Sequence, residues 1–428
     1  MPATLYIFIA LFACLLIGIP IAFSIGIATL STLLIYDIVP LSLMAQKLTV
    51  AGDSFPLLAI PYFMLAGEIM ARGGISEKLV GFGKSIVGSA TGSLGIVTVV
   101  CCAIFAAISG SGPATVAAIG GIMVPYMVKD GYEEGYASTL AAVGGTLGPI
   151  IPPSVCFIMY GVVASVSITD LFLSGVIPGI LIMFSLCILT YCISRKYGYG
   201  VVPKEEKVKP TLSNIAKSFW DAKWAVLMPV IILGGIYGGF FTPTEAAVVA
   251  CAYGLIISLF VTREMSWREL PEVLGGVALT MGSCVIMVGC AVAFGEVMTI
   301  MGIPKIIADF LTGITSSKLV ALILIDILLL IVGCFFETLS AILILAPILL
   351  NVVTTFGVDK IHFGLIMVTA MVIGQVTPPV GINLFVGSRI LGIKVEKMFK
   401  WLPIFLAVMV LDLLIVTFIP QLSLFLLG

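Results

Sequence analysis

The sequence predicts an all-α polytopic membrane protein built from two similar repeats. Apolar residues make up 61% of the 428 residues and charged residues only 10%. Apolar runs of helix-spanning length recur along the chain, and two proline-pair breaks share their local spacing. A soluble domain carries about 45–50% apolar and about 25% charged residues. The composition therefore excludes a soluble enzyme and a disordered chain, and a net charge of −1 offers no basic surface for nucleic acid.

The apolar runs predict the membrane-spanning helices. A helix needs about 20 apolar residues to cross the hydrocarbon core. Predicted spans, none with the alternation of a β-barrel strand, are 5–36 (long, broken at Pro20), 171–194, 224–240, 246–262, 274–294, 319–335 and 403–425. Segments too short or too broken to cross simply are 93–109 with 113–128, 137–151 with 154–164, 339–353, and 363–377 with 380–389. Such segments are the best sequence indication of a transporter's binding site.

The most charged stretch, Arg195–Lys223, divides the chain near its middle. It holds seven basic residues against three acidic ones. The positive-inside rule places it in the cytoplasm. We interpret it as a solvated linker without chemistry.

The two halves carry the same pattern of breaks. Each has a glycine four residues before a proline pair, in Gly148–Pro153 and in Gly374–Pro379. A polar break lies upstream of each pair. The interval is 41 residues from Ser111 to Pro152 and also 41 from Glu337 to Pro378. Matched order and spacing indicate two structural repeats.

The polar break at 109–115, SGSGPAT, lies between two apolar runs of about 16 residues, each too short to cross the hydrocarbon core comfortably. It therefore predicts a re-entrant hairpin with a polar tip. Pro113 is placed to open the returning helix. The alternative is an ordinary exposed loop between two short spans. Glu337 lies in the matching second break, 337–340, and an acid inside the membrane is by default a functional candidate; the alternative is a helix cap near the membrane surface.

The proline pairs predict what the breaks bind. A proline pair removes two backbone N–H donors and interrupts the helix. The freed carbonyls cannot face lipid, so they line an enclosed cavity or bind a ligand. Carbonyl oxygens suit a small cation, and helix N-termini suit an anion. The breaks thus predict a cation-coupled anion site.

Four other polar residues are weaker candidates. Asp326 is expected to bond a neighbouring helix rather than touch substrate, and Glu245 to lie in the first turn of a helix. Arg72 reads more readily as an interfacial anchor than as an anion ligand. Asn383 could add a polar side chain to the second break.

Several chemistries are excluded or disfavoured. The ten cysteines lack metal-ligand spacing and are interpreted as small buried side chains, and only one histidine, His362, is present. A phosphate-binding loop ending at Gly83–Ser85 would need glycine where Lys78 stands. An intramembrane serine protease would need His362 as its base, although that residue lies near an interface. An ion channel is the more serious alternative, because channels also use re-entrant segments.

The breaks and their flanks resemble the large membrane subunit of tripartite ATP-independent periplasmic (TRAP) transporters, the DctM-type family, over essentially the whole chain. The most specific motifs are SGSGPATVAAIG at 109–120, GGTLGPIIPPS at 144–154, TPTEAA at 242–247, GQVTPPVGINLF at 374–385 and GEIMARGGIS at 67–76. The particular similarity is to the sialic-acid branch, whose motifs the dicarboxylate members share.

The resemblance implies an elevator-type secondary transporter, not an enzyme, with no catalytic residue. Its implied organisation is an N-terminal scaffold with arm helices at 1–92, a first transport repeat at 93–194 (hairpin 93–128, broken helix 137–164), a cytoplasmic linker at 195–223, second scaffold and arm helices at 224–318, a second transport repeat at 319–400 (hairpin 319–356, broken helix 363–391), and a C-terminal membrane helix at 401–428.

The resemblance also implies the site residues. Substrate contacts are expected from Ser109, Ser154, Glu337 and Arg72. A first sodium site is expected at Ser109, Ser111, Gly144, Gly145, Gly148 and Pro149, and a second at Gly333, Thr338, Gly374 and Thr377. Glu337 suits substrate hydroxyl or amide donors better than a carboxylate.

The implied setting is the bacterial inner membrane. The expected coupling ion is Na⁺, with two or more sites, and the expected substrate is an organic anion, sialic acid first. The expected partners are a small membrane subunit of about four helices and a periplasmic substrate-binding protein. A C4-dicarboxylate TRAP transporter and a stand-alone sodium/anion symporter of similar hairpin plan stay open as alternatives, with an ion channel behind them.

Overall fold

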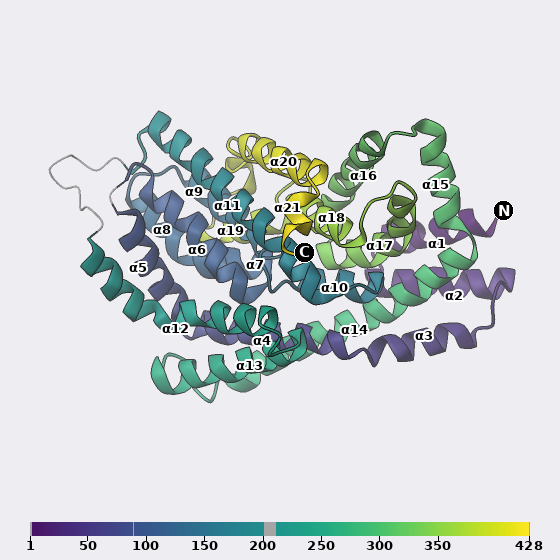
Figure 1. The fold of residues 1–428 in the computed structure, drawn as a ribbon, viewed down its shortest axis with the longest axis horizontal. Coiled ribbons are helices and arrows are strands. Elements are labelled where there is room, and N and C mark those ends of the chain that lie inside the picture. Colours follow the sequence, from purple (N-terminus) through teal and green to yellow (C-terminus); the bar gives the residue numbers. More distant parts are fainter. Residues whose placement is uncertain (1, 89, 201–210, 428) are drawn as a thin grey trace.

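The computed structural model describes residues 2–88, 90–200 and 211–427, and all regular elements in these ranges are helical (Figure 1). Seven described helices are long and apolar enough to cross a membrane, or eight if the bent pair Leu402–Phe418 and Gln421–Leu427 is one span. The predicted all-α, polytopic class is confirmed.

The helices follow in chain order. Those before the linker are α1 (Ala3–Leu16), α2 (Ile21–Tyr36), α3 (Ser42–Gly52), α4 (Ala59–Arg72), α5 (Ile75–Val87), α6 (Ser93–Ser109), α7 (Gly112–Thr115), α8 (Gly121–Lys129), α9 (Glu134–Gly144), α10 (Val155–Ala164) and α11 (Ile168–Tyr197). Those after it are α12 (Leu212–Tyr237), α13 (Pro243–Ile256), α14 (Leu270–Ile300), α15 (Ile303–Ile314), α16 (Lys318–Gly333), α17 (Thr338–Thr355), α18 (Lys360–Gly374), α19 (Ile382–Leu391), α20 (Leu402–Phe418) and α21 (Gln421–Leu424).

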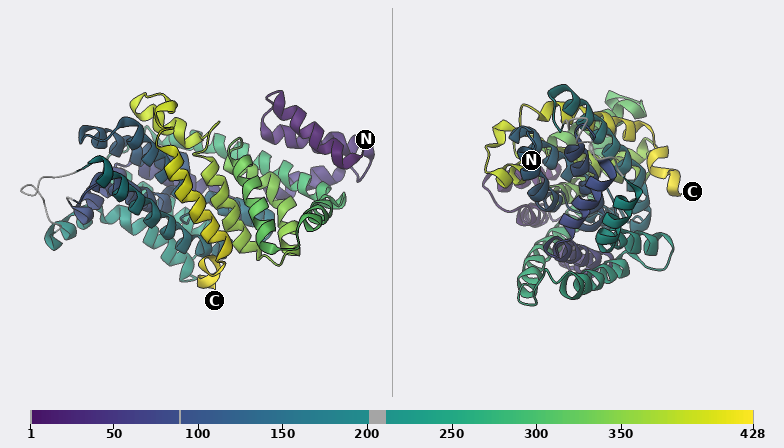
Figure 2. Two further views of the ribbon diagram at one scale, coloured as in Figure 1. Left: turned by 90° about the horizontal axis from the view of Figure 1, so that it is seen from above. Right: turned by 90° about the vertical axis from the view of Figure 1, so that its left-hand side faces the viewer.

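The N-terminal apolar run, 5–36, is predicted as one long span broken at Pro20, and the structure differs. It forms two short helices, α1 and α2, which pack against each other. Gly18 adopts a positive φ of 86° and Pro20 caps α2, so the chain reverses there, and Tyr6 meets Tyr36 with ring centroids 5.6 Å apart. Both views place this pair at one end of the elongated molecule (Figures 1 and 2).

The 31-residue helix α14 runs through the lower part of the molecule in Figure 1. It packs along α2, α3 and α4 and also reaches α17. At about 1.5 Å rise per residue it is longer than the hydrocarbon core is thick. It therefore joins the N-terminal helices to the second half of the chain.

At the centre of the molecule, helices of the first half pack against helices of the second half. The first broken helix consists of α9 and α10, and the second of α18 and α19. α9 packs on α19, and α10 packs on α17 and α18. These elements contribute to the largest buried apolar cluster. The two proline breaks therefore lie in the interior of one packed unit.

Two ion pairs close one end of this unit. Lys397 and Lys400 lie 2.9 Å and 2.7 Å from the carboxylates of Glu134 and Glu133, at the start of α9. The hydrogen bond to Glu133 raises the pKa of the Lys400 ammonium above its usual value, so this ammonium stays charged at neutral pH. Because the side chains are exposed, each pair contributes little to the stability of the fold.

Candidate substrate and cation site

The first polar break forms a tight tip between α6 and α7. Gly110 ends α6 in the left-handed region, with φ of 59°, a conformation that glycine adopts without strain. Thr115 Oγ1 donates to Ser111 O at 2.8 Å, and Ser109 Oγ lies 2.9 Å from Thr115 Oγ1. Pro113 stands in the first turn of α7, as predicted. The tip thus gathers two hydroxyls around one backbone carbonyl.

The first tip is in backbone contact with the first proline break. A Cβ atom on Gly148 would lie 2.5 Å from Ser111 O and 2.9 Å from Gly112 N. Gly145 also faces this tip, whereas Gly144 packs against the sulfur of Cys102. Of the residues predicted for the first sodium site, the structure therefore places Gly145 and Gly148 directly against the tip.

Ser154 closes the first break. It is fully buried and is the N-cap of α10, where its Oγ accepts from Phe157 N at 3.3 Å. The same hydroxyl donates to Pro149 O at 2.5 Å. The predicted substrate contact thus already bridges both sides of the break, including the carbonyl of Pro149 that was expected to bind sodium.

The second polar break lies between α16 and α17. Glu337 is the N-cap of α17, and its carboxylate accepts from Ser340 N at 3.1 Å and from Ser340 Oγ at 3.3 Å. It also lies within electrostatic range of Cys156, two residues after Ser154 in α10. The capping alternative is thus present in the structure, but on a tip that faces α10 inside the packed unit.

The second tip meets the second proline break as closely as the first tip meets its own. A Cβ atom on Gly374 would fall 2.2 Å from the carbonyl carbon of Gly333. Thr338 Oγ1 accepts from Gln375 Nε2 at 2.8 Å, and Thr377 Oγ1 donates to Ile373 O at 2.7 Å. The residues predicted for the second sodium site therefore come from both walls of one contact.

Gln375 is a site residue that sequence reasoning missed. Its Nε2 bonds the second tip, while its buried Oε1 has no hydrogen-bond partner among the described residues and points at the first tip, where a Cβ on Gly112 would lie 2.4 Å from it. Asn383, in α19, approaches Gly112 beside it and donates to Ala142 O at 3.3 Å. The available signal was an amide directly after Gly374 inside an apolar segment. Gln375 therefore connects the two tips.

A cavity of about 290 Å³ opens beside the first tip. Its walls come from α4, the tip and α14, and include Arg72, Glu68, Ser109, Ser111, Glu272 and Thr280. Arg72 Nε lies 3.1 Å from Glu68 and Nη2 lies 3.0 Å from Glu272. The structure thus brings Arg72 together with Ser109 and Ser111, while Ser154 and Glu337 do not line this cavity. An anion entering it would compete with two carboxylates for the guanidinium.

Two weaker expectations are confirmed away from the tips. Glu245 is the third residue of α13 and completes a capping box with Thr242, since its carboxylate accepts from Thr242 N at 2.8 Å. Asp326, in α16, accepts from Thr417 of α20 at 2.9 Å. Within the described ranges, no three His, Cys, Asp or Glu side chains gather where they could hold a metal ion.

Two polar tips, each packed against a glycine–proline break inside a many-helix membrane chain, are the architecture of a membrane transport protein. A family model described as the DctM component of the tripartite ATP-independent periplasmic transporter matches residues 8–422. The chain belongs to this family. It is thus a multi-pass transporter subunit of the bacterial inner membrane rather than an enzyme.

Named relatives share this family. The chain is 43% identical to the isethionate TRAP transporter permease protein DctMQ of Oleidesulfovibrio alaskensis, over 99% of this chain and 66% of that relative. It is 37% identical to the C4-dicarboxylate TRAP transporter large permease protein DctM of Rhodobacter capsulatus, over 99% and 98% of the two chains. It is 36% identical to the sialic acid TRAP transporter large permease protein SiaM of Vibrio cholerae, over 96% and 95%.

A solved structure shares the fold. The crystal structure of the Alcanivorax borkumensis YdaH transporter matches with a TM-score of 0.62 over 88% of this chain and 87% of that one, at 13% identity. At this identity the likeness concerns the fold alone.

Proposed function

We propose that this chain is the large membrane subunit of a sodium-coupled transporter that imports an organic anion by an elevator movement. The observation that carries the proposal is the pair of tip–break contacts joined through Gln375. Each contact places backbone carbonyls and hydroxyls of two segments together, which is the oxygen-rich setting that a small hard cation needs.

The first sodium ion is assigned to the first contact, among Ser109, Ser111, Gly145, Gly148 and the neighbouring carbonyls. The second is assigned to Gly333, Thr338, Gly374 and Thr377. Sodium can drive import only if cation and anion increase each other's affinity. Since each contact joins a tip to a break, a cation that holds the contact closed would order the tip before the anion arrives.

The substrate is proposed to be a small organic acid, with sialic acid tested first. The named relatives handle isethionate, C4-dicarboxylates and sialic acid, which all carry a negative charge. The cavity at the first tip supplies one cation, Arg72, and the hydroxyls of Ser109 and Ser111. A small membrane subunit and a periplasmic binding protein are proposed as the partners.

Uptake into proteoliposomes tests the proposal. Vesicles hold this chain with its small membrane subunit, and labelled sialic acid, a C4-dicarboxylate or isethionate is offered on its binding protein under an inward sodium gradient. We expect uptake of one of these anions only when sodium and binding protein are both present. Uptake without the binding protein would instead indicate a stand-alone symporter, and non-saturating flux without sodium a channel.

Arg72→Gln is expected to raise the anion concentration for half-maximal uptake by about tenfold or more, because a charge-assisted hydrogen bond is worth roughly 1.5–3 kcal/mol. Glu272→Gln releases the guanidinium from one carboxylate and should not raise that concentration. Arg268→Gln, on an exposed arginine outside the cavity, is the matched control. If Arg72→Gln transports with unchanged half-saturation, Arg72 only holds α4 to α14.

A further inference from the structure

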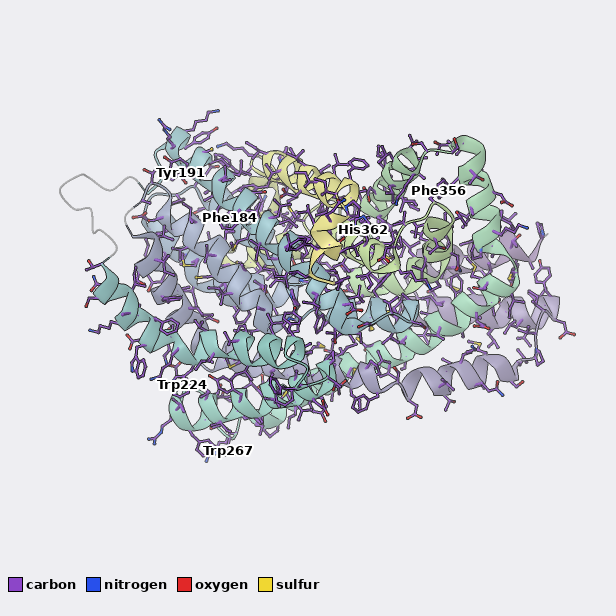
Figure 3. The ribbon with its side chains drawn as sticks, viewed as in Figure 1. Phe184, Tyr191, Trp224, Trp267, Phe356 and His362 are labelled. Carbon is purple, nitrogen blue, oxygen red and sulfur yellow. The ribbon has the colours of Figure 1, made fainter. Side chains whose placement is uncertain are left out.

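A chain of four buried polar residues lies outside the two tip–break contacts. Asp326, His362, Thr417 and Ser423 are each 2% exposed or less. They come from α16, α18, the end of α20 and α21. Figure 3 shows His362 beside the C-terminal turn, drawn in yellow. Buried titratable groups in a membrane protein are expensive and therefore call for a function.

Hydrogen bonds connect the four residues in order. Thr417 Oγ1 donates to Asp326 Oδ2 at 2.9 Å. His362 Nε2 lies 3.3 Å from Thr417 O, and His362 Nδ1 lies 2.7 Å from Ser423 Oγ. Ser423 Oγ in turn lies 2.8 Å from Pro420 O. Asp326 and His362 are thus joined through one residue, Thr417.

Counting the hydrogen-bond donors of these four residues shows two arrangements of their hydrogens that differ by one proton. The carbonyl of Thr417 only accepts, so His362 Nε2 carries a hydrogen. Ser423 has a single hydroxyl hydrogen. If it goes to Pro420 O, His362 Nδ1 must also carry a hydrogen and the ring is an imidazolium. If it goes to His362 Nδ1, the ring is neutral and Pro420 O loses this donor. All the contacts are hydrogen bonds only in the protonated arrangement.

The carboxyl group of Asp326 sets the electrostatic requirement. In the part of the chain that the structure describes, its Oδ2 has one donor, Thr417, and its Oδ1 is buried without a partner. A carboxylate in this position without a compensating charge would be a buried, unpaired ion, which costs several kcal/mol. A proton on His362 supplies an opposite charge on the far side of Thr417, and a proton on Asp326 removes the charge. Only the proton on His362 also makes every contact of the ring and of Ser423 a hydrogen bond, so the ring is where the pair holds its proton.

The surroundings contain few other charges. Asp359 and Lys360 lie at the start of α18, and Lys318 at the start of α16. Asp359 and Lys318 act on His362 with opposite sign. From α10, the hydroxyl of Tyr160 donates to Lys360 O at 2.7 Å.

A second buried carboxyl, Asp412 of α20, is bonded to Ser185 of α11 at 2.8 Å. Within the described ranges none of these side chains bonds to the His362 ring, and Asp326 is the buried acid that hydrogen bonds join to the ring, through Thr417.

The position of the pair gives a route for the proton. α11 ends near the basic stretch that the positive-inside rule places in the cytoplasm, so its start at Ile168 faces the periplasm. α10 ends beside that start, and Tyr160 fixes the first turn of α18 to α10. Asp359 and Lys360 are exposed there. His362 therefore lies one turn inside the periplasmic surface.

We propose that Asp326 and His362 form a proton-binding site that holds α16 and α18 against the C-terminal helix. α16 leads to the second tip and α18 to the second proline break, so binding and release of this proton act on the same two elements that are assigned to the second sodium ion. The site takes one proton from the periplasmic side and involves no residue of the tips. It adds a proton-dependent step to transport.

His362 is the only histidine of the chain, so its protonation can be read without ambiguity. The whole complex is prepared in lipid nanodiscs with ¹⁵N-histidine in this chain alone, and the ring nitrogen shifts are followed from low to high pH. We expect a titration whose proton affinity falls at least about tenfold in Asp326→Asn, because the compensating negative charge is gone. Asp309→Asn, on an exposed aspartate of α15, should leave it unchanged.

A second variant keeps the test decisive if Asp326→Asn does not fold. Thr417→Val removes the hydroxyl that bonds Asp326, at nearly constant shape. It should lower the proton affinity of the His362 ring, as Asp326→Asn does. A ring that stays neutral throughout, or that titrates alike in wild type and both variants, overturns the proposal. This readout needs no substrate, so it stands apart from the uptake assay. In that assay, we expect the pH dependence of uptake to be flattened in His362→Gln.

Discussion

Gly374→Ala is expected to lower uptake to less than about a tenth of the wild-type rate. The new methyl group would sit 2.2 Å from the carbonyl carbon of Gly333, and both partners are backbone, so no side chain can swing aside. Overpacking of this kind costs roughly 1–3 kcal/mol or separates the two segments. Separation would open the contact assigned to the second sodium ion. Sodium-driven uptake, normalised to the amount of protein in the membrane, measures the effect.

Gly313→Ala is the matched control, since a Cβ atom there meets no atom of the described residues within 4 Å and the residue is also helical. It should transport like wild type. Size-exclusion profiles and thermal unfolding of both variants separate lost folding from lost transport. Wild-type uptake by Gly374→Ala would show that the second tip does not need to touch its break.

Gln375→Leu is expected to raise the sodium concentration for half-maximal uptake by about tenfold. The leucine keeps the volume but removes the donor to Thr338 Oγ1, leaving a buried hydroxyl oxygen without its partner at a cost of about 1–3 kcal/mol. It also removes the link between the two tips. Uptake measured over a range of sodium concentrations, at fixed ionic strength, reports the change.

Gln421→Leu makes the same chemical change at the exposed start of α21 and should not alter the sodium dependence. A shift in sodium dependence confined to Gln375→Leu assigns the effect to the amide between the tips. Equal sodium dependence in Gln375→Leu and wild type would remove Thr338 and Gln375 from the cation site.

Local sequence signals predicted the breaks well. A proline pair cannot continue a helix, and a glycine-rich polar run between short apolar runs cannot be a simple span. The structure accordingly breaks the helices at Pro152–Pro153 and Pro378–Pro379, where both peptide bonds are cis, and turns the chain at Gly110. These features depend on residues within a few positions of one another, so they are readable without knowledge of the fold.

Contacts between distant segments could not be predicted in the same way. Nothing near Gln375 indicates that its amide reaches Gly112 or Thr338, and nothing near Ser154 indicates that its hydroxyl is used by Pro149 and Phe157. The folding back of α1 on α2 was missed for a related reason. Pro20 tells that the helix is interrupted, but the direction that the chain takes next depends on what it packs against. The roles of the predicted substrate and sodium residues stay predictions.

The packing of each broken helix against the other half of the chain also affects folding during synthesis. α9 is complete at Gly144, yet the helix that covers it, α19, begins only at Ile382. At about 5–20 residues per second, the ribosome needs on the order of ten seconds or more to make the chain between them. During that interval the first half is in the bilayer while the face of α9 that packs on α19 is still uncovered. Premature termination before α19 should therefore yield a protein that is inserted but open to proteases and quality control.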